Sequence, residues 1–360
     1  MSESPIEIAW FSALCDDDYE ILGVPDTRLR SSFEHCLEIT RHAEAGDFDN
    51  ILLPSGYQLG VDGVAFAAGV AATLRRLPLL LAVRCGEMWP PQLARQLASL
   101  DEMLGGRLTL NIISSDLPGA PLASGPRYRR TLEVMKLLRQ WMSGEPVAFD
   151  GEFHSFDLEP PGLCVRRRRC PPFYFGGLSE EARDVAAQEA DVFLMWPDTL
   201  DGLQSILGDM RKRASHYDRT LRFGYRVHVI VRETESEARE AARTLMSGVD
   251  EAQGESIRKR SLDHASEGVR RQAQLRSDAD ADGYAEEFLF TGIGRARSGC
   301  GAALVGDPDQ VVAKLMAYRE LGIESFILSG YPHVDECDRV ARYVLPRLDH
   351  APIYVEKSTA

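Results

Sequence analysis

The sequence has few cysteines, and their spacing excludes two classes of protein. Seven cysteines are scattered over 360 residues, with no Cys-x-x-Cys pair and in an odd number. Small secreted domains are dense in paired cysteines, and structural zinc sites hold them in close pairs. We therefore expect reduced thiols in a cytoplasmic protein, with neither a disulfide scaffold nor a metal site.

Long apolar runs and an excess of positive charge are also missing. No window approaches the roughly 18 apolar residues that a membrane helix needs, and the N-terminal segment lacks the pattern of a signal peptide. The formal net charge of −14 disfavours nucleic acid or an anionic membrane as a partner. The one basic run, Arg166–Arg169, is too short to reverse this, and we interpret it as a solvated loop.

What the sequence does contain is a regular alternation of short apolar segments and segments with helical spacing. Eight such pairs are typical of a (β/α)8 barrel, so we predict an α/β protein with one TIM-barrel domain over residues 1–360. A doubly wound sheet is the alternative, but it does not need a helix beside every strand. The predicted strands are Ile6–Leu14, Asp49–Pro54, Leu77–Arg84, Gly106–Ile113, Pro171–Gly176, Asp191–Trp196, Arg222–Arg232 and Glu324–Leu328.

Two segments interrupt this alternation. Val147–Phe156 predicts a hairpin that turns at Asp150-Gly151. Residues 248–301 are charged and poor in strand formers, with a helix predicted over Glu255–Leu275. Because so long an excursion between core elements is usually functional or disordered, we predict a mobile insertion that serves as a lid.

Arg226 and His228 alternate within the apolar run Tyr225–Val231. At a period of two residues, both side chains lie on one face of a strand. A cation and an imidazole inside a strand are costly unless an anion or a hydrogen-bond partner meets them. One interpretation is a buried arginine–carboxylate pair beside a hydrogen-bonded histidine; the other is a site for an anionic ligand.

Polar residues at strand ends are the other candidates, because a barrel of this kind carries its site there. Two glycines and Ser179 follow one strand, where backbone amides can reach an anion at a helix N-terminus. Tyr331 and His333 follow the last strand, and with Arg226 and His228 they suit oxyanion binding and proton transfer. Each position can also be an ordinary helix cap or turn. Further polar or aromatic residues at strand ends are Arg84, Asn111, Ser114 and Trp196.

From near residue 5 to about 349, the chain resembles the flavin-dependent alkanesulfonate monooxygenases of the bacterial-luciferase-like superfamily. Six segments carry the resemblance: GRLTLNIISSD (106–116), GEPVAFDGEFHSF (144–156), PPFYFGGLSEEARDVAAQEAD (171–191), RFGYRVHVIVRETESEA (222–238), RARSGCGAALVGD (295–307) and LGIESFILSGYPHVDE (321–336). The last three of these segments are specific to the sulfonate branch.

The resemblance implies a two-component enzyme that binds reduced FMN from a separate NAD(P)H-dependent FMN reductase. The flavin reacts with O2 to give a flavin peroxide, which oxygenates the carbon next to sulfur in a small anionic substrate. An alkanesulfonate then yields an aldehyde and sulfite. A flavin peroxide survives only where water is excluded, which is the role expected of the lid. We also expect a homo-oligomer, either a dimer or a tetramer.

Three alternatives stay open. The substrate can be a sulfone or another pathway-specific acid, the enzyme can use F420 for hydride transfer, or the protein can store flavin without turnover.

Site residues follow from the resemblance by matching positions. The catalytic residues are Arg226, which pairs with the sulfonate, His228, Tyr331 and Arg297, which closes over flavin and substrate. The substrate contacts are Trp10, Leu59, Arg226, Arg297 and His333, with Leu59 and Trp89 facing a partly apolar tail. The flavin contacts are Asn111, Ser114, Tyr128, Gly177, Leu178, Ser179 and Trp196, of which Tyr128 and Ser179 hold the phosphate.

The chain departs from the family at the rim of the site. No cysteine follows the second strand, where the sequence is Ser55–Gly60, and the first loop, Leu14–Asp18, has a cysteine and acidic residues in place of a histidine. Ser124 replaces a histidine ahead of Arg127-Tyr128, in a shortened loop. The resemblance therefore supports the class of flavin monooxygenase more firmly than it supports the substrate.

Overall fold

The computed structural model describes residues 4–250, 252, 254–255, 266–297 and 299–353. Eight parallel strands form a barrel in the order β13, β1, β2, β3, β4, β7, β8, β9, and the pairing of β9 with β13 closes it. The predicted (β/α)8 fold is confirmed. The barrel strands are β1 (Glu7–Phe11), β2 (Asn50–Leu53), β3 (Leu79–Arg84), β4 (Leu108–Ile113), β7 (Phe173–Phe175), β8 (Val192–Met195), β9 (Arg222–Val231) and β13 (Ser325–Ser329).

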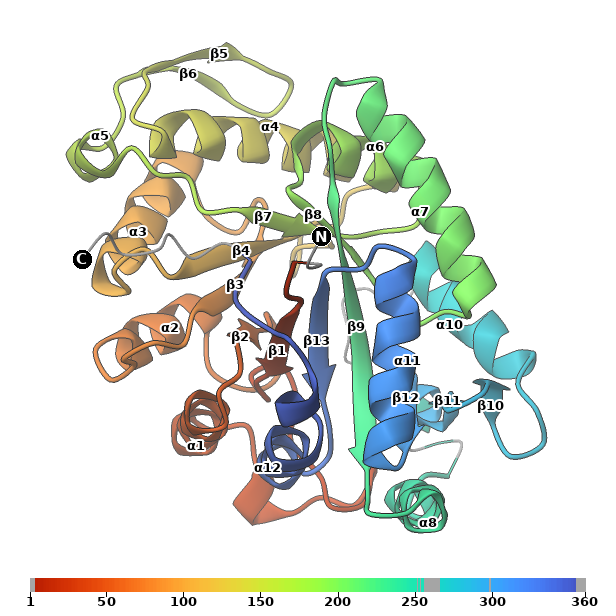
Figure 1. The fold of residues 1–360 in the computed structure, drawn as a ribbon. Helices are drawn as coiled ribbons and strands as arrows, with labels where there is room; N and C mark the ends of the chain where they lie inside the picture. The colour runs from red at the N-terminus through yellow and green to blue at the C-terminus, as the bar shows by residue number, and fades with distance from the viewer. Residues whose placement is uncertain (1–3, 251, 253, 256–265, 298, 354–360) are drawn as a thin grey trace.

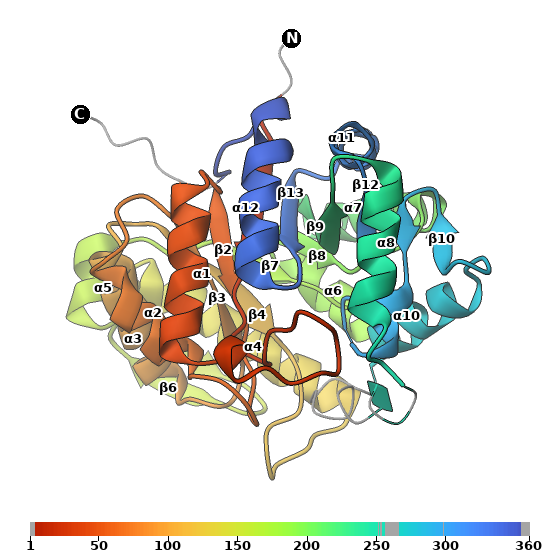
Figure 2. The same cartoon turned by 90° about the horizontal axis from the view of Figure 1, so that it is seen from below.

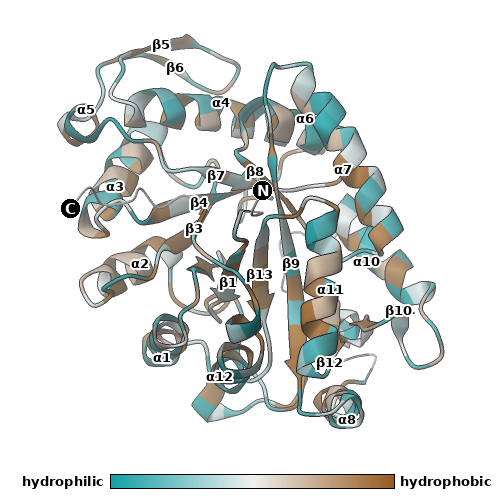
Figure 3. Cartoon of the chain, in the orientation of Figure 1, coloured by the Kyte–Doolittle hydropathy of each residue, from teal (hydrophilic) through white to brown (hydrophobic). Residues whose placement is uncertain are grey.

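Helices surround the barrel on its outside (Figure 1). They carry both apolar and polar residues (Figure 3), because one face packs on the strands and the other meets water. None of the helices in the described ranges is long and apolar enough to cross a membrane. The helices are α1 (Phe33–Ala45), α2 (Gly63–Ala71), α3 (Pro90–Met103), α4 (Ser124–Met142), α5 (Gly162–Arg167), α6 (Glu180–Glu189), α7 (Leu200–Ser215), α8 (Glu235–Met246), α10 (Glu267–Ser277), α11 (Pro308–Glu320) and α12 (His333–Tyr343).

The barrel interior is filled at its middle and at the amino-terminal ends of its strands. Near those ends, the buried Glu7 carboxylate accepts hydrogen bonds from the hydroxyls of Tyr174 and Ser325, each at 2.7 Å. Space for a ligand therefore lies at the carboxyl ends. The apolar layer in between consists of Ala9, Leu52, Leu80, Tyr174, Val192 and Ile327.

The predicted hairpin is confirmed and lies beside α4, outside the barrel (Figure 1). Its strands β5 (Val147–Asp150) and β6 (Ser155–Leu158) pair antiparallel. Glu133 on α4 fixes the turn, because its carboxylate accepts a hydrogen bond from the backbone N–H of Glu152 at 2.6 Å.

The predicted insertion contains more strand than its composition suggests. The short strands β10 (Tyr284–Glu286) and β11 (Leu289–Phe290) pair antiparallel and lead to β12 (Ala303–Gly306), which extends the sheet beside β9. Of the helix expected over Glu255–Leu275, Glu255 is helical and α10 covers Glu267–Ser277, while residues 256–265 lie outside the described residues. Figure 2 shows α10 and β10 on the side of the barrel next to α8. Motion of this segment as a lid stays a prediction.

Candidate active site

Two cavities open at the carboxyl ends of the barrel strands and share the wall formed by Asn111, Ile113, Leu194 and Trp196. We name the first the arginine cavity, because Arg84, Arg226 and Arg297 all line it. We name the second the amide cavity, because the backbone from Gly176 to Ser179 borders it. Of the predicted site residues, the arginine cavity takes Leu59, Asn111, Trp196, Arg226, His228, Arg297, Tyr331 and His333, and the amide cavity takes Asn111, Ser114, Tyr128, Gly177, Leu178, Ser179 and Trp196.

Arg226 is the buried cation of the arginine cavity. Its Nη1 donates to the carbonyl oxygens of Val227 at 3.1 Å and Ile327 at 3.5 Å, and its guanidinium lies 4.2 Å from the centre of the Phe11 ring. None of these partners is anionic, and it forms no ion pair with a carboxylate of the described residues. Burial lowers its pKa. The first interpretation of this strand is therefore wrong for the arginine–carboxylate pair, and a site for an anionic ligand stays a prediction.

His228 is held in a neutral form from both sides of its ring. Its Nε2–H donates to the carbonyl oxygen of Cys300 at 3.2 Å, and its Nδ1 accepts from the Ser329 hydroxyl at 2.6 Å. Burial, and then the charges of Arg226 and Arg297, keep its pKa well below the ordinary value. An imidazole with both nitrogens engaged is suited to forming the cavity wall and fixing Cys300 beside Arg226, and unsuited to exchanging a proton with a ligand.

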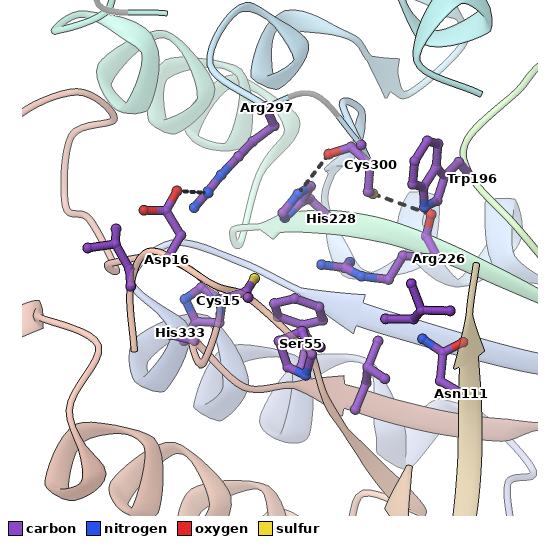
Figure 4. A pocket seen from close by; sticks show the side chains of 18 of the residues that line it. Cys15, Asp16, Ser55, Asn111, Trp196, Arg226, His228, Arg297, Cys300 and His333 are labelled. Atoms are coloured by element: carbon purple, nitrogen blue, oxygen red, sulfur yellow. Dashed lines mark hydrogen bonds and ion pairs between the residues drawn. The ribbon is translucent and has the colours of Figure 1, made fainter. Parts of the chain in front are cut away.

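Arg297 enters the cavity from the predicted lid segment and points toward Asp16 (Figure 4). It forms an ion pair with Asp16, and its guanidinium lies 5.1 Å from the centre of the Tyr331 ring. Burial opposes its charge, but Tyr331 and Asp16 raise its pKa overall. The buried Nε has no hydrogen-bond partner among the described residues. Arg297 is therefore a charged donor whose Nε–H is available to a ligand.

His333 is aligned by a carboxylate that the sequence did not single out. Asp18, fully buried, accepts hydrogen bonds from the backbone N–H of His333 at 2.8 Å and from its Nδ1–H at 2.7 Å. It also lies 3.0 Å from Nε2 of His35. Burial disfavours the charge on Asp18, but the charge of His333 and the hydrogen bonds from His333 and His35 lower its pKa overall. Nε2 of His333 is left buried, without a hydrogen-bond partner in the described residues, on a side chain that lines the arginine cavity.

The amide cavity has the features of a phosphate site. Ser179 caps α6 by accepting the N–H of Ala182 at 3.2 Å, and its hydroxyl hydrogen stays available to an anion at this helix N-terminus. Gly177 has a φ of 153°, and a Cβ there would come within 2.6 Å of the Ala182 Cβ and 3.4 Å of the Tyr128 hydroxyl. The chain thus leaves a small cradle that a side chain would fill.

A cation and a phenol border the same cradle. Arg127 is paired with Asp116 at 3.1 Å, but its buried Nε has no hydrogen-bond partner among the described residues. Tyr128 lies next to it on α4, and the Ser114 hydroxyl at the end of β4 accepts from Thr131 at 2.9 Å. These residues would fit a phosphate group such as that of a flavin mononucleotide.

Trp10 and Trp89 do not contact the arginine cavity, contrary to the expectation. Side chains alternate along β1, so Trp10 points outward and packs on Phe48 with ring centres 5.2 Å apart, while the next residue, Phe11, lines the cavity. Trp89 precedes α3, is 62% exposed, and packs on Phe156.

Several lining residues were not assigned from the sequence. They are Cys15 and Asp16 after β1, Ser55 after β2, Arg84 at the end of β3, and Cys300. The acidic first loop and the polar end of β3 were visible signals, since both follow barrel strands, but single residues there are usually caps or turns. Cys15 lies against the backbone of Gly56, in the second loop, where the family cysteine is missing.

Comparisons with known proteins agree with this architecture. The family model described as luciferase-like monooxygenase matches residues 19–325. A sulfoquinovose monooxygenase of Novosphingobium aromaticivorans is 60% identical over 362 aligned positions, covering 99% of this chain and all of the relative. Another, of Agrobacterium fabrum, is 50% identical and covers 95% of this chain and 89% of the relative. Among solved structures, the EDTA monooxygenase of Chelativorans sp. BNC1 superposes with a TM-score of 0.77 at 17% identity, covering 99% of this chain and 96% of the other, which shows the shared fold.

Proposed function

The chain belongs to the luciferase-like monooxygenase family, and on that basis we propose that it is an FMN-dependent monooxygenase that removes the sulfonate group from a sulfonated sugar. The observation that carries the proposal is the buried Arg226 guanidinium, which lines a cavity without a carboxylate partner in the described residues. Two relatives named for sulfoquinovose match nearly the whole chain and support the sugar. The proposal therefore replaces the plain alkanesulfonate suggested by the resemblance.

Bound FMN, reduced by a separate NAD(P)H-dependent reductase, would supply two electrons with which one atom of O2 enters the substrate and the other leaves as water. The substrate carbon next to sulfur gains the oxygen atom, and the carbon–sulfur bond then breaks. The products are an aldehyde and sulfite.

Binding of the sulfonate is assigned to the two arginines of the cavity. Arg226 has no competing anion among the described residues, so a sulfonate is the charge that compensates its burial. A guanidinium offers paired N–H groups that match the oxygens of such a group. Arg297 adds its free Nε from the other side, while Asp16 holds its Nη1 in place.

Proton transfer is assigned to His333. With Nδ1–H committed to Asp18, the ring in its neutral form would carry its lone pair on Nε2, on the side of the cavity. We infer that Nε2 accepts the hydroxyl proton of the oxygenated carbon. The new C=O then forms, and the electrons of the carbon–sulfur bond leave with sulfite. The carboxylate behind the imidazole stabilises the positive charge that the ring acquires.

Exclusion of water is assigned to two chain segments that border the arginine cavity. Ala296, Arg297, Gly299 and Cys300 line it from the predicted lid, and residues 55–59 line it from the loop after β2. Such closure protects a reactive oxidant from hydrolysis and strengthens the interactions inside.

The proposed function is tested by a sulfite-release assay with FMN, a flavin reductase, NADH and sulfoquinovose. We expect one sulfite for each substrate consumed, and we expect reduced FMN to bind under nitrogen. F420-dependent hydride transfer is the competing function, and reduced F420 is titrated in parallel. Binding of reduced F420 alone, together with no sulfite from any sulfonate, would overturn the proposal.

A further inference from the structure

Arg84 lies on the opposite side of the barrel from Arg226, and the proposed chemistry gives it no role. It ends β3, whereas Arg226 belongs to β9, and in the closed strand order these two strands are four positions apart in either direction. Both arginines nevertheless line the arginine cavity. A ligand that fills this cavity is therefore held between two guanidinium groups.

The two groups differ in how their charge is compensated. The Nε of Arg84 lies 2.8 Å from a carboxylate oxygen of Glu87, so its charge is paired within the chain. Its Nη2 donates to the Ser55 hydroxyl at 3.4 Å, and its buried Nη1 has no hydrogen-bond partner among the described residues. Arg84 is only 5% exposed. A buried donor with no partner is costly, so this nitrogen indicates a ligand acceptor.

The chemistry of that acceptor follows from the charge. A guanidinium already neutralised by Glu87 needs no second anion, but its remaining N–H groups can donate to neutral oxygens. Ser55, which contacts it, and Gln58, which lines the same cavity, are also neutral and polar. An alkyl chain would leave all these groups unsatisfied, whereas a polyhydroxylated carbon chain would satisfy them.

We propose that Arg84, supported by Ser55, forms a subsite for sugar hydroxyls and selects a sulfonated sugar over an alkanesulfonate. The inference rests on the proposed function and deepens it: Arg226 and Arg297 hold the charged end of the substrate, and Arg84 recognises its neutral end.

The test compares Arg84→Met with Glu87→Gln on sulfoquinovose and on hexanesulfonate. Met keeps the length of the side chain and removes the donors. Gln removes the ion pair but keeps the donors, and Glu87 does not line the cavity. We measure kcat/KM by sulfite release, the affinity for each sulfonate by calorimetry, and the affinity for reduced FMN under nitrogen.

We expect Arg84→Met to lower affinity and kcat/KM for sulfoquinovose by roughly 30-fold, as for loss of a charge-assisted hydrogen bond. Its values for hexanesulfonate and its affinity for reduced FMN should stay within about threefold of the wild type, and Glu87→Gln should retain the preference for the sugar. Equal losses on both sulfonates, or loss of FMN affinity, would overturn the subsite and leave the monooxygenase activity standing. Absence of sulfite from either compound with the wild-type protein would instead overturn the proposed function, and the subsite with it.

Discussion

Two groups of arginines differ in what surrounds them, and the difference indicates which group serves function. Arg166–Arg169 is the most conspicuous basic feature of the sequence, yet every one of its members has a carboxylate partner. Arg167 and Arg169 both contact Asp101 of α3, at 2.8 and 2.5 Å, and Asp101 is only 1% exposed. Arg226, by contrast, lies in an apolar run of the sequence and has no carboxylate partner among the described residues.

The basic run is thus a structural clamp, and only its alternate members fit the expected solvated loop. The side chains of Arg166 and Arg168 are 68% and 61% exposed, whereas those of Arg167 and Arg169 are 19% and 14% exposed. The basic run and its carboxylate partners hold two segments of the chain together. The buried charge of Arg226, which has no carboxylate partner among the described residues, instead indicates a ligand.

The largest expected effect is a loss of stability on removal of Asp101, the carboxylate that Arg167 and Arg169 share. Asp101→Asn leaves two mostly buried guanidinium groups without their shared carboxylate, so we expect unfolding free energy to fall by about 3 kcal/mol. Urea denaturation measures this, and kcat/KM should not change. Glu145→Gln, which removes the partner of the exposed Arg168, is the matched control and should cost less than about 1 kcal/mol. Equal costs for the two variants would contradict the clamp.

At Arg226 we expect the reverse, a loss of activity without a loss of stability. Arg226→Met should lower kcat/KM on the sulfonate at least ~30-fold, or about 2 kcal/mol of transition-state binding. The melting temperature should hold or rise, because an unpaired buried charge is removed. Arg222→Met, on the exposed start of the same strand, should leave the activity unchanged. A large loss of stability with normal turnover in Arg226→Met would show that the arginine is structural.

A smaller effect is expected where a carboxylate acts through another residue. Asp18→Asn cannot hold the Nδ1–H of His333 as a charged acceptor, so we expect kcat to fall about tenfold, at the low end for loss of general acid–base catalysis, with KM for the sulfonate nearly unchanged. His35→Gln retains a donor to Asp18 and is the control. A change confined to KM would argue against proton transfer by His333.

The smallest effect concerns acid stability. The pKa of His228 lies well below 6.5 because of burial and the two nearby arginines. Between that depressed pKa and 6.5 the unfolded chain binds a proton that the folded chain does not, so the stability present above pH 6.5 is lost as pH falls. Melting temperatures from pH 7.5 to 5.5 should therefore fall by about 2 °C more for the wild type than for His228→Gln. Parallel curves would contradict the neutral histidine.

Much of the barrel could be predicted, because each barrel strand is a local apolar run and several helices begin at a capping side chain, as α1 does at Ser32 and α6 at Ser179. The alternation of Arg226 and His228 similarly places both on one face before any contact is known. The strands of the insertion could not be predicted in this way. β10 and β11 are short, and their pairing depends on contacts with neighbouring strands rather than on the strand propensity of their own residues. Trp10 was assigned to the wrong face of β1. Neighbouring side chains on a strand point to opposite faces, so a shift of one residue exchanges the cavity side for the side that packs on the helices.

The order of strands and helices could be read from the sequence alone, and the class of enzyme from the resemblance that the sequence carries. Those properties reside in periodicity and in short motifs. Which charges are paired could be seen only in the folded chain: Asp18 lies behind His333 and Glu87 beside Arg84, whereas no carboxylate of the described residues pairs with Arg226. The reason is physical, because the energy of a buried charge depends on what lies within a few ångströms, and residues far apart in the chain supply those neighbours.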